Sequence, residues 1–272
     1  MDVALIGGPR PGFTIERMHT GASLIGGRIV PWDGASFGCA FQNRLLVERE
    51  GTLRWGGEVI DVNTNVIDAM EVRLFGRLGL LAVHRGMQIR FYERRESPAE
   101  RWPYREIYSF YTASEQGGLL IQDIDGDGYP DIICGNYWIR SPREFHLPWQ
   151  LHAINLWNED PLSASARLLW ADGKLLWLES KRPKARASWF RPPADPRQLW
   201  IEEPLGLTLD RPRGLCQYKG EIWIGDRTRV LTLSDRRVRA TGGPYLQLLP
   251  SPDGVVAVTP SQISAIEDGA SP

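Results

Sequence analysis

Apolar residues along this chain occur in short runs that glycine, proline or charged residues interrupt. The runs LLV after Arg44, LLAV after Gly79 and IIC after Asp131 are typical. No stretch of about ten residues keeps the 3.6-residue periodicity of a helix. Glycine (28 residues) and proline (20 residues) are spread over the whole chain. This pattern predicts an all-β protein.

The short runs belong to a repeated unit, in which a polar or glycine position, an apolar run, a turn and a second strand follow one another. Seven copies begin at Asp2, Arg44, Gly79, Asp131, Lys174, Glu221 and Gly254, about 42 residues apart on average. This period is the length of one four-stranded propeller blade, whereas a β-sandwich has no reason for so long a period. We therefore predict a single-domain β-propeller over residues 1–272, with seven blades favoured and six as the alternative.

Each of these hairpins is expected to form the two middle strands of a blade. A further strand precedes some of them, as in GGLLIQDID before Asp131 and YLQLLPSPD before Gly254, and WQLHAI follows the hairpin at Asp131. The chain begins inside a hairpin and ends soon after the last one. If the two ends meet, strands from both termini complete one blade and cover its edges.

The stretch DIDGDGYPD holds four aspartates in nine residues, which is the densest group of acids in the chain. Calcium takes about six to eight oxygen ligands, and a tight loop supplies them where glycines let the backbone curl around the ion. The spacing predicts a calcium site with side-chain ligands at Asp123, Asp125, Asp127 and Asp131 and the backbone carbonyl of Tyr129.

The loop resembles the D-x-D-x-D-G-x-x-D calcium loop of FG-GAP and VCBS-type propeller repeats. The resemblance covers Gly117 to Ile154 and includes the continuations GNYWIRSP and WQLHAI. It implies the same five calcium-binding positions. The corresponding turns elsewhere read WADGK, SPDGV and YKGE, so we expect one calcium site only.

Three other interpretations of the loop are an EF-hand, a polar turn without metal and a catalytic site. An EF-hand is excluded because its twelfth position is Cys134 rather than glutamate and because strands, not helices, flank the loop. A polar turn without metal leaves four carboxylates to repel one another. A catalytic role for the aspartates is disfavoured, since calcium ligands in such blades are coordinatively filled.

Other side chains suggest packing rather than chemistry. Five tryptophans at strand positions are expected to pack between blades: Trp138, Trp177, Trp189, Trp200 and Trp223. Among the four histidines, His152 is expected to be hydrogen-bonded within its blade, and His84 is placed near the channel mouth without a catalytic role. No nucleophile elbow, phosphate-binding loop or dinucleotide fingerprint occurs.

Charge and cysteine content limit the partners. The 32 basic and 33 acidic residues give a net charge of −1, which predicts no nucleic-acid binding. No apolar run approaches the roughly 18 residues of a membrane span, so no membrane insertion is expected. The three cysteines, Cys39, Cys134 and Cys216, are predicted to be buried free thiols. We expect a monomer.

The segment from Ser180 to Pro193 holds five basic residues and no acid, which indicates a solvated loop or, alternatively, a patch for an acidic glycan or protein.

The amino terminus favours a cytoplasmic protein, because Asp2 stands where a secretory signal carries positive charge. The family resemblance instead points to exported or cell-surface relatives, and both locations stay open. For function, the leading hypothesis is a non-enzymatic propeller, stabilised by one calcium ion, that binds a carbohydrate or protein partner. The alternative is a carbohydrate-active enzyme, of the polysaccharide lyase or sugar dehydratase type, with its site at the central channel.

Overall fold

The computed structural model describes residues 20–94, 101–109, 117–157 and 165–266. Within these ranges, 25 strands form seven antiparallel sheets and no α-helix occurs. Accordingly, this part of the chain holds no helix of the length and apolarity needed to cross a membrane.

Six of the sheets have three or four strands and form blades 1 to 6 in chain order. Blade 1 consists of β3 (Phe37–Phe41), β4 (Arg44–Arg49), β5 (Thr52–Trp55) and β6 (Glu58–Val62). Blade 2 consists of β7 (Val66–Leu74), β8 (Arg77–His84), β9 (Gln88–Glu93) and β10 (Tyr104–Ser109). Blade 3 consists of β11 (Leu119–Gln122), β12 (Asp131–Cys134), β13 (Tyr137–Arg140) and β14 (Gln150–Ala153).

The second half of the chain repeats this arrangement. Blade 4 consists of β15 (Ala166–Ala171), β16 (Lys174–Glu179), β17 (Ala187–Arg191) and β18 (Ile201–Pro204). Blade 5 consists of β19 (Gly214–Tyr218), β20 (Glu221–Gly225), β21 (Arg229–Thr232) and β22 (Val238–Thr241). Blade 6 has three described strands, β23 (Gln247–Ser251), β24 (Gly254–Val258) and β25 (Ile263–Ile266). The seventh sheet is a hairpin of β1 (Ala22–Ile25) and β2 (Arg28–Pro31).

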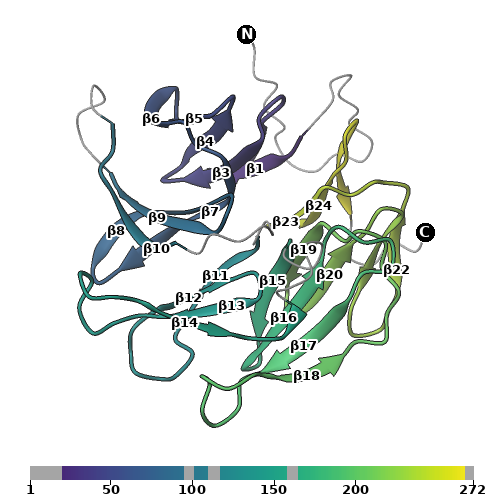
Figure 1. Cartoon of the computed structure of the whole chain (residues 1–272). Coiled ribbons are helices and arrows are strands. Elements are labelled where there is room, and N and C mark those ends of the chain that lie inside the picture. Colours follow the sequence, from purple (N-terminus) through teal and green to yellow (C-terminus); the bar gives the residue numbers. More distant parts are fainter. Residues whose placement is uncertain (1–19, 95–100, 110–116, 158–164, 267–272) are drawn as a thin grey trace.

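The first strands of the blades surround a common axis (Figure 1). Each contacts the next in the order β3, β7, β11, β15, β19 and β23, and β1 contacts both β23 and β3. The ring therefore closes through the hairpin of β1 and β2, which lies between blade 6 and blade 1. The chain is an all-β propeller with six blades, the alternative count from the sequence.

Six of the seven predicted hairpins occupy the expected place, as the second and third strands of blades 1 to 6. The first, which begins at Asp2, lies outside the described residues. The strands predicted before Asp131, before Gly254 and after the Asp131 hairpin are β11, β23 and β14. The described strands of blade 6 all come from residues 247–266, so within them no strand from the amino terminus completes this blade.

The hydrophobic core is divided among the spaces between neighbouring sheets. One cluster joins blades 3 and 4 through Trp138, Trp177 and Trp200, and Trp223 is buried between blades 5 and 6. These four tryptophans are buried between blades as predicted, and Trp189 is half-buried against the apolar cluster of blades 4 and 5. Large rings fill the wedge that opens between blades away from the axis. The three cysteines are free, with Cys134 and Cys216 buried and Cys39 half-buried.

Candidate functional site

The aspartate loop, residues 123–130 together with Asp131, connects β11 to β12 in blade 3. In the other blades the same connection is a two-residue turn: Gln42–Asn43, Phe75–Gly76, Asp172–Gly173, Lys219–Gly220 and Pro252–Asp253. In the turn between β15 and β16, for example, Asp172 and Gly173 both have positive φ angles, 50° and 71°. Such turns are closed by backbone conformation alone. The longer loop of blade 3 needs its side chains to organise it.

Two aspartates organise the backbone of the loop. Asp123 accepts hydrogen bonds from the N–H groups of Gly126 (2.9 Å) and Gly128 (3.0 Å) through separate carboxylate oxygens. Asp131 is fully buried and accepts from the N–H groups of Ile124 (3.1 Å) and Ser141 (2.8 Å). Each carboxylate therefore closes a part of the chain that has no strand partner.

Three of the predicted ligands lie close together. Asp123, Asp125 and Asp131 each offer a carboxylate oxygen, and these atoms lie within 4.8 Å of one another. Asp127 is not part of this group. Its carboxylate accepts from the N–H of Tyr129 (3.0 Å), and the ring of Tyr129 stacks on Phe75 of the turn in blade 2. The loop therefore gathers three carboxylates directly.

Burial raises the pKa of the Asp131 carboxyl to about 6, although its two backbone hydrogen bonds oppose the rise. The negative charge of Asp125 adds to the effect. Desolvation and a like charge both disfavour the ionised form, so a cation beside this carboxylate would stabilise it.

A guanidinium group already lies against the loop. Arg140, at the end of β13, contacts Asp125 through Nε (2.5 Å) and Asp127 through Nη2 (3.1 Å). Four aspartates thus face one arginine, and an excess of negative charge is left. Arg140 was not among the predicted site residues. The antiparallel register pairs Ile132 with Ile139 and so places Arg140 opposite Asp131. Pairing the two strands of the predicted hairpin in this register would have found it.

A cavity of about 340 Å³ lies next to this ion pair. Asp125, Trp138 and Arg140 line it from blade 3, and Asp195 and Arg197 line it from the loop between β17 and β18 of blade 4. Arg197 pairs with Asp195 at 2.7 Å rather than with the aspartate loop. The cavity therefore contains a second arginine that does not touch the predicted ligands.

Two further cavities, of about 430 and 380 Å³, lie along the axis of the ring. The larger is lined by residues of β3, β7, β15, β19 and β23, and both share Ser36, Ile67 and Arg167. The two cavities are therefore neighbours, and together they are called the channel here. The central channel is where the enzyme alternative from the sequence places its site.

A histidine cluster consists of His84, Tyr92 and Arg90 of blade 2 and Asp61 of blade 1. The Tyr92 hydroxyl donates to Asp61 Oδ2 (2.7 Å), and Arg90 Nη1 donates to the same oxygen (3.1 Å). His84 Nε2 lies 3.1 Å from the Tyr92 hydroxyl. Burial lowers the pKa of His84 to about 4, and the charge of Arg90 lowers it further.

The histidine cluster belongs to the interface between blades rather than to the channel. His84 is 2% exposed, Tyr92 is fully buried, and neither lines a cavity described above. The neighbours Asn65 and Arg85 do line the channel, so His84 lies beside the channel but does not face it.

His152 packs on Trp138 at 4.8 Å between ring centroids, and its buried Nε2 has no hydrogen-bond partner among the described residues. The predicted hydrogen bond within the blade is therefore not made by this nitrogen. His146 is exposed, and His19 lies outside the described residues.

The basic segment from Ser180 to Pro193 is not a free loop. Its later part forms β17, and two of its arginines meet acids that lie outside the segment in sequence. Arg182 contacts the buried Glu179 at 3.1 Å, and Arg191 contacts Glu203 at 3.6 Å. The absence of acids within the segment was a misleading signal, because neighbouring strands supply them.

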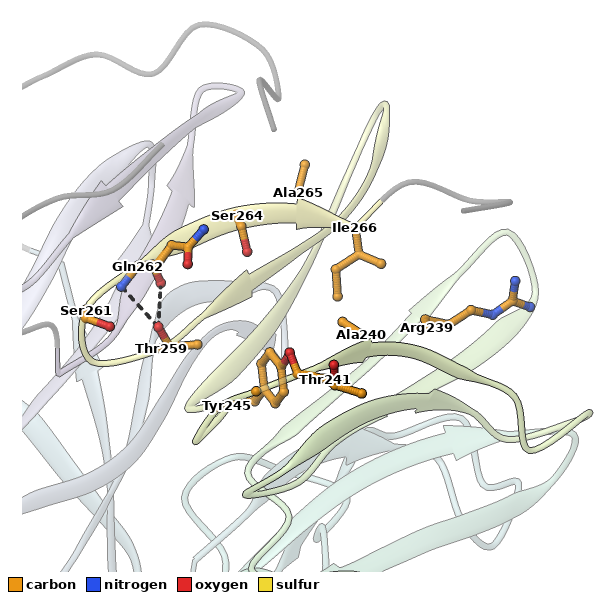
Figure 2. Close-up of a pocket in the computed structure, with 12 residues that line it drawn as sticks. Arg239, Ala240, Thr241, Tyr245, Thr259, Ser261, Gln262, Ser264, Ala265 and Ile266 are labelled. Atoms are coloured by element: carbon orange, nitrogen blue, oxygen red, sulfur yellow. Dashed lines mark hydrogen bonds between the residues drawn. The ribbon is translucent and has the colours of Figure 1, made fainter. Parts of the chain in front are cut away.

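A cavity of about 510 Å³ lies beside β25, in the place that a fourth strand takes in the other blades (Figure 2). Gln262, Ser264 and Ile266 line it from blade 6, and Thr241 and Tyr245 line it from the side of blade 5. The lining carries no cluster of ionisable groups, since Arg239 is its only charged residue among those described.

Comparisons with known proteins give fold likenesses only. No family model matches the chain, and no curated protein matches it. The β-propeller domain of Nup133 from Vanderwaltozyma polyspora is 10% identical, with 82% of this chain and 79% of that chain covered and a TM-score of 0.47. The S. cerevisiae core factor is 14% identical, with coverages of 82% and 40% and a TM-score of 0.41.

A sialidase from Trypanosoma rangeli is 10% identical, with 92% of this chain and 51% of that chain covered and a TM-score of 0.36. At such similarity none of these structures carries an argument about activity or ligand. The assignment of the propeller fold rests on the sheet order and ring contacts described above.

Proposed function

We propose that this chain is a non-enzymatic binding propeller that one calcium ion stabilises and that presents its channel to a carbohydrate or protein partner. The observation that carries the calcium part is the meeting of Asp123, Asp125 and Asp131 within 4.8 Å. Hard carboxylate oxygens on a glycine-containing loop are the ligands that calcium prefers. The proposed resemblance to FG-GAP and VCBS-type repeats agrees with this choice of ion.

The donor set fits a divalent cation. Asp123, Asp125 and Asp131 would hold the ion directly, and Asp127 and the Tyr129 carbonyl would complete the shell. Four carboxylates and the Arg140 guanidinium carry three net negative charges when all are ionised, and a calcium ion would reduce this to one. The ion would thus neutralise negative charge that Arg140 alone leaves uncompensated.

The site would have a structural role. The loop joins two strands of blade 3, and Asp131 ties it to the end of β13 through the Ser141 N–H. Fixing the loop would hold these strands in register and would keep the shape of the adjoining cavity. The channel, lined by five of the first strands, is the proposed ligand surface.

Thermal unfolding in calcium and in chelator tests the calcium part. Calcium at a hundred times its dissociation constant should add about 2.7 kcal/mol to the stability of the folded chain. Asp125→Asn should reduce this gain, and Asp172→Asn, in the two-residue turn of blade 4, should keep it. Equal melting temperatures in calcium, in magnesium and in chelator would reject the proposal.

A glycan array probed with the calcium-loaded chain tests the carbohydrate part. Lyase and hydrolase assays on every glycan that binds then separate binding from catalysis. The enzyme alternative would require a reactive cluster in the channel, whereas the His84 cluster lies between blades. Cleavage of a bound glycan would overturn the non-enzymatic assignment.

A further inference from the structure

The larger axial cavity is lined by both apolar and polar side chains. Phe37 of β3, Ile67 of β7 and Leu215 of β19 line it, together with leucines next to and within β23. Its volume of about 430 Å³ lies within the usual range of small-molecule sites, which are mostly apolar with a few polar groups. The chemistry of a ligand is therefore decided by those few groups.

Among the described residues that line this cavity, three are charged: Asp68, Arg167 and Arg213. Burial raises the pKa of the Asp68 carboxyl, and the nearby backbone N–H groups of Ala69, Leu119 and Gly118 oppose the rise. The charge of Arg167 also acts on it. The one carboxylate in the cavity is thus already provided with donors.

Arg213 differs from its neighbour Arg211 in its ion pairing. No described carboxylate forms a salt bridge with it, whereas its neighbour Arg211 pairs with Asp210 at 3.1 Å. Arg167 lies close, because its Nε donates to the Arg213 carbonyl oxygen at 3.0 Å. Burial lowers the pKa of Arg213, and the positive charges of Arg167 and Arg211 add to this effect.

We propose that the axial cavity binds a small organic anion, whose carboxylate lies between Arg167 and Arg213 and whose apolar body packs on Phe37, Ile67 and Leu215. The guanidinium group suits this task because its planar fork matches a carboxylate. One negative charge would balance the excess of one arginine over Asp68 in the cavity. This inference rests on the proposed binding function and names the ligand class of the channel.

Benzoate is a suitable probe, with benzamide as its uncharged counterpart and inorganic phosphate as an anion without an apolar body. Saturation-transfer NMR and calorimetry at constant ionic strength would measure binding to the wild type, to Arg167→Gln and to Arg213→Gln. Arg54→Gln is the matched control, because Arg54 on β5 of blade 1 is exposed, as Arg213 is, but lines neither axial cavity. Arg213→Gln removes a guanidinium that bonds to no described residue, so its fold should be retained.

Both channel variants should bind benzoate about tenfold or more weakly, since a hydrogen-bonded charge contributes about 1.5–3 kcal/mol. The control should bind it as the wild type does, and benzamide should not bind saturably. Equal benzoate affinity in Arg213→Gln and wild type, or no saturable benzoate binding at all, would overturn the inference. Equal affinity for phosphate would reject the contribution of the apolar walls.

The experiment is run in calcium and in chelator, so that two failures can be told apart. If the calcium proposal fails, chelator changes neither stability nor benzoate binding, and the anion site stands. If the anion inference fails, benzoate binding is absent or insensitive to Arg213, while calcium still raises the melting temperature.

Discussion

The aspartate loop and the histidine cluster are both built from charged and polar side chains, yet they balance their charges differently. The loop sets four aspartates against one arginine at the surface of blade 3. The cluster sets Asp61 against Arg90 and joins them to Tyr92 and His84 by hydrogen bonds. One group has a charge excess, and the other is neutral.

This difference indicates which of the two groups would be stabilised by a bound cation. A buried charge is stable when it is paired, and in the histidine cluster Asp61 and Arg90 pair with each other while His84 is neutral. The aspartate loop satisfies its backbone N–H groups but leaves carboxylates uncompensated. The loop should therefore respond to cations, and the cluster should respond to protons.

The largest expected effect is the response of the histidine cluster to acid. The pKa of His84 is about 4 in the folded chain and about 6.5 when unfolded, so between these values only the unfolded state gains the proton. The stability from this group is complete above pH 6.5 and is lost as pH falls toward 4. The loss should reach about 3 kcal/mol, measured by urea unfolding across this pH range.

Two variants isolate that effect from other titrating groups. His84→Gln should flatten the dependence of unfolding free energy on pH between 6.5 and 4.5. His146→Gln should leave it unchanged, because the His146 side chain is 68% exposed. A pH dependence that is the same in wild type and His84→Gln would contradict the assignment.

The next effect concerns the carboxylate that anchors the aspartate loop. Asp131→Asn replaces one accepting oxygen by an amide group that cannot accept from a backbone N–H. This change should destabilise the fold by about 2–3 kcal/mol at pH 7.5 in chelator, because a buried donor is left unsatisfied. Urea unfolding measures it.

Asp172→Asn is the matched substitution in a two-residue turn. Asp172 is exposed and has a φ of 50°, which asparagine tolerates well, so its effect should stay within about 0.5 kcal/mol. Similar losses for Asp131→Asn and Asp172→Asn would mean that the long loop needs no more side-chain support than a short turn.

The smallest expected effect separates Arg140 from a calcium ion. Arg140→Gln removes the group that competes with calcium for Asp125, so calcium should bind about 2- to 5-fold more tightly. The same variant in chelator should lose at most about 1 kcal/mol, because the ion pair is partly exposed. Calorimetric titration with calcium measures the affinity.

Arg197→Gln distinguishes this direct competition from a general change in charge. Arg197 lines the same cavity but bonds to Asp195 rather than to the loop. Its replacement should change calcium affinity less than that of Arg140. Equal gains in the two variants would show that Arg140 acts only through its charge at a distance.

Much of the fold could be predicted because each blade repeats one local pattern. Apolar runs separated by turn residues identified the second and third strands of all six blades, and the second strands of blades 2 to 6 are buried along nearly their whole length. The hairpin of β1 and β2 was missed, although Gly26 and Gly27 both have positive φ angles and form its turn. The two flanking strands are only four residues long and form a two-stranded sheet, so they do not match the longer unit that repeats in the blades.

The candidate sites differ in the same way, because one is contiguous in sequence and the others are not. The aspartate loop is contiguous in sequence, so its spacing was visible, and only Arg140 across the hairpin was overlooked. The histidine cluster joins Asp61 to Tyr92, and the axial cavity joins Phe37 to Arg213, which are far apart in sequence. Such residues come together only when the ring closes, so no local sequence pattern predicts these sites.

Calorimetric titration of the wild-type chain with calcium, after treatment with chelator, tests the central claim most directly. We expect saturable binding of one calcium ion per chain, lost or strongly weakened in Asp125→Asn and retained in Asp172→Asn. Absence of saturable binding in the wild type, or unchanged binding in Asp125→Asn, would contradict a calcium site in the aspartate loop.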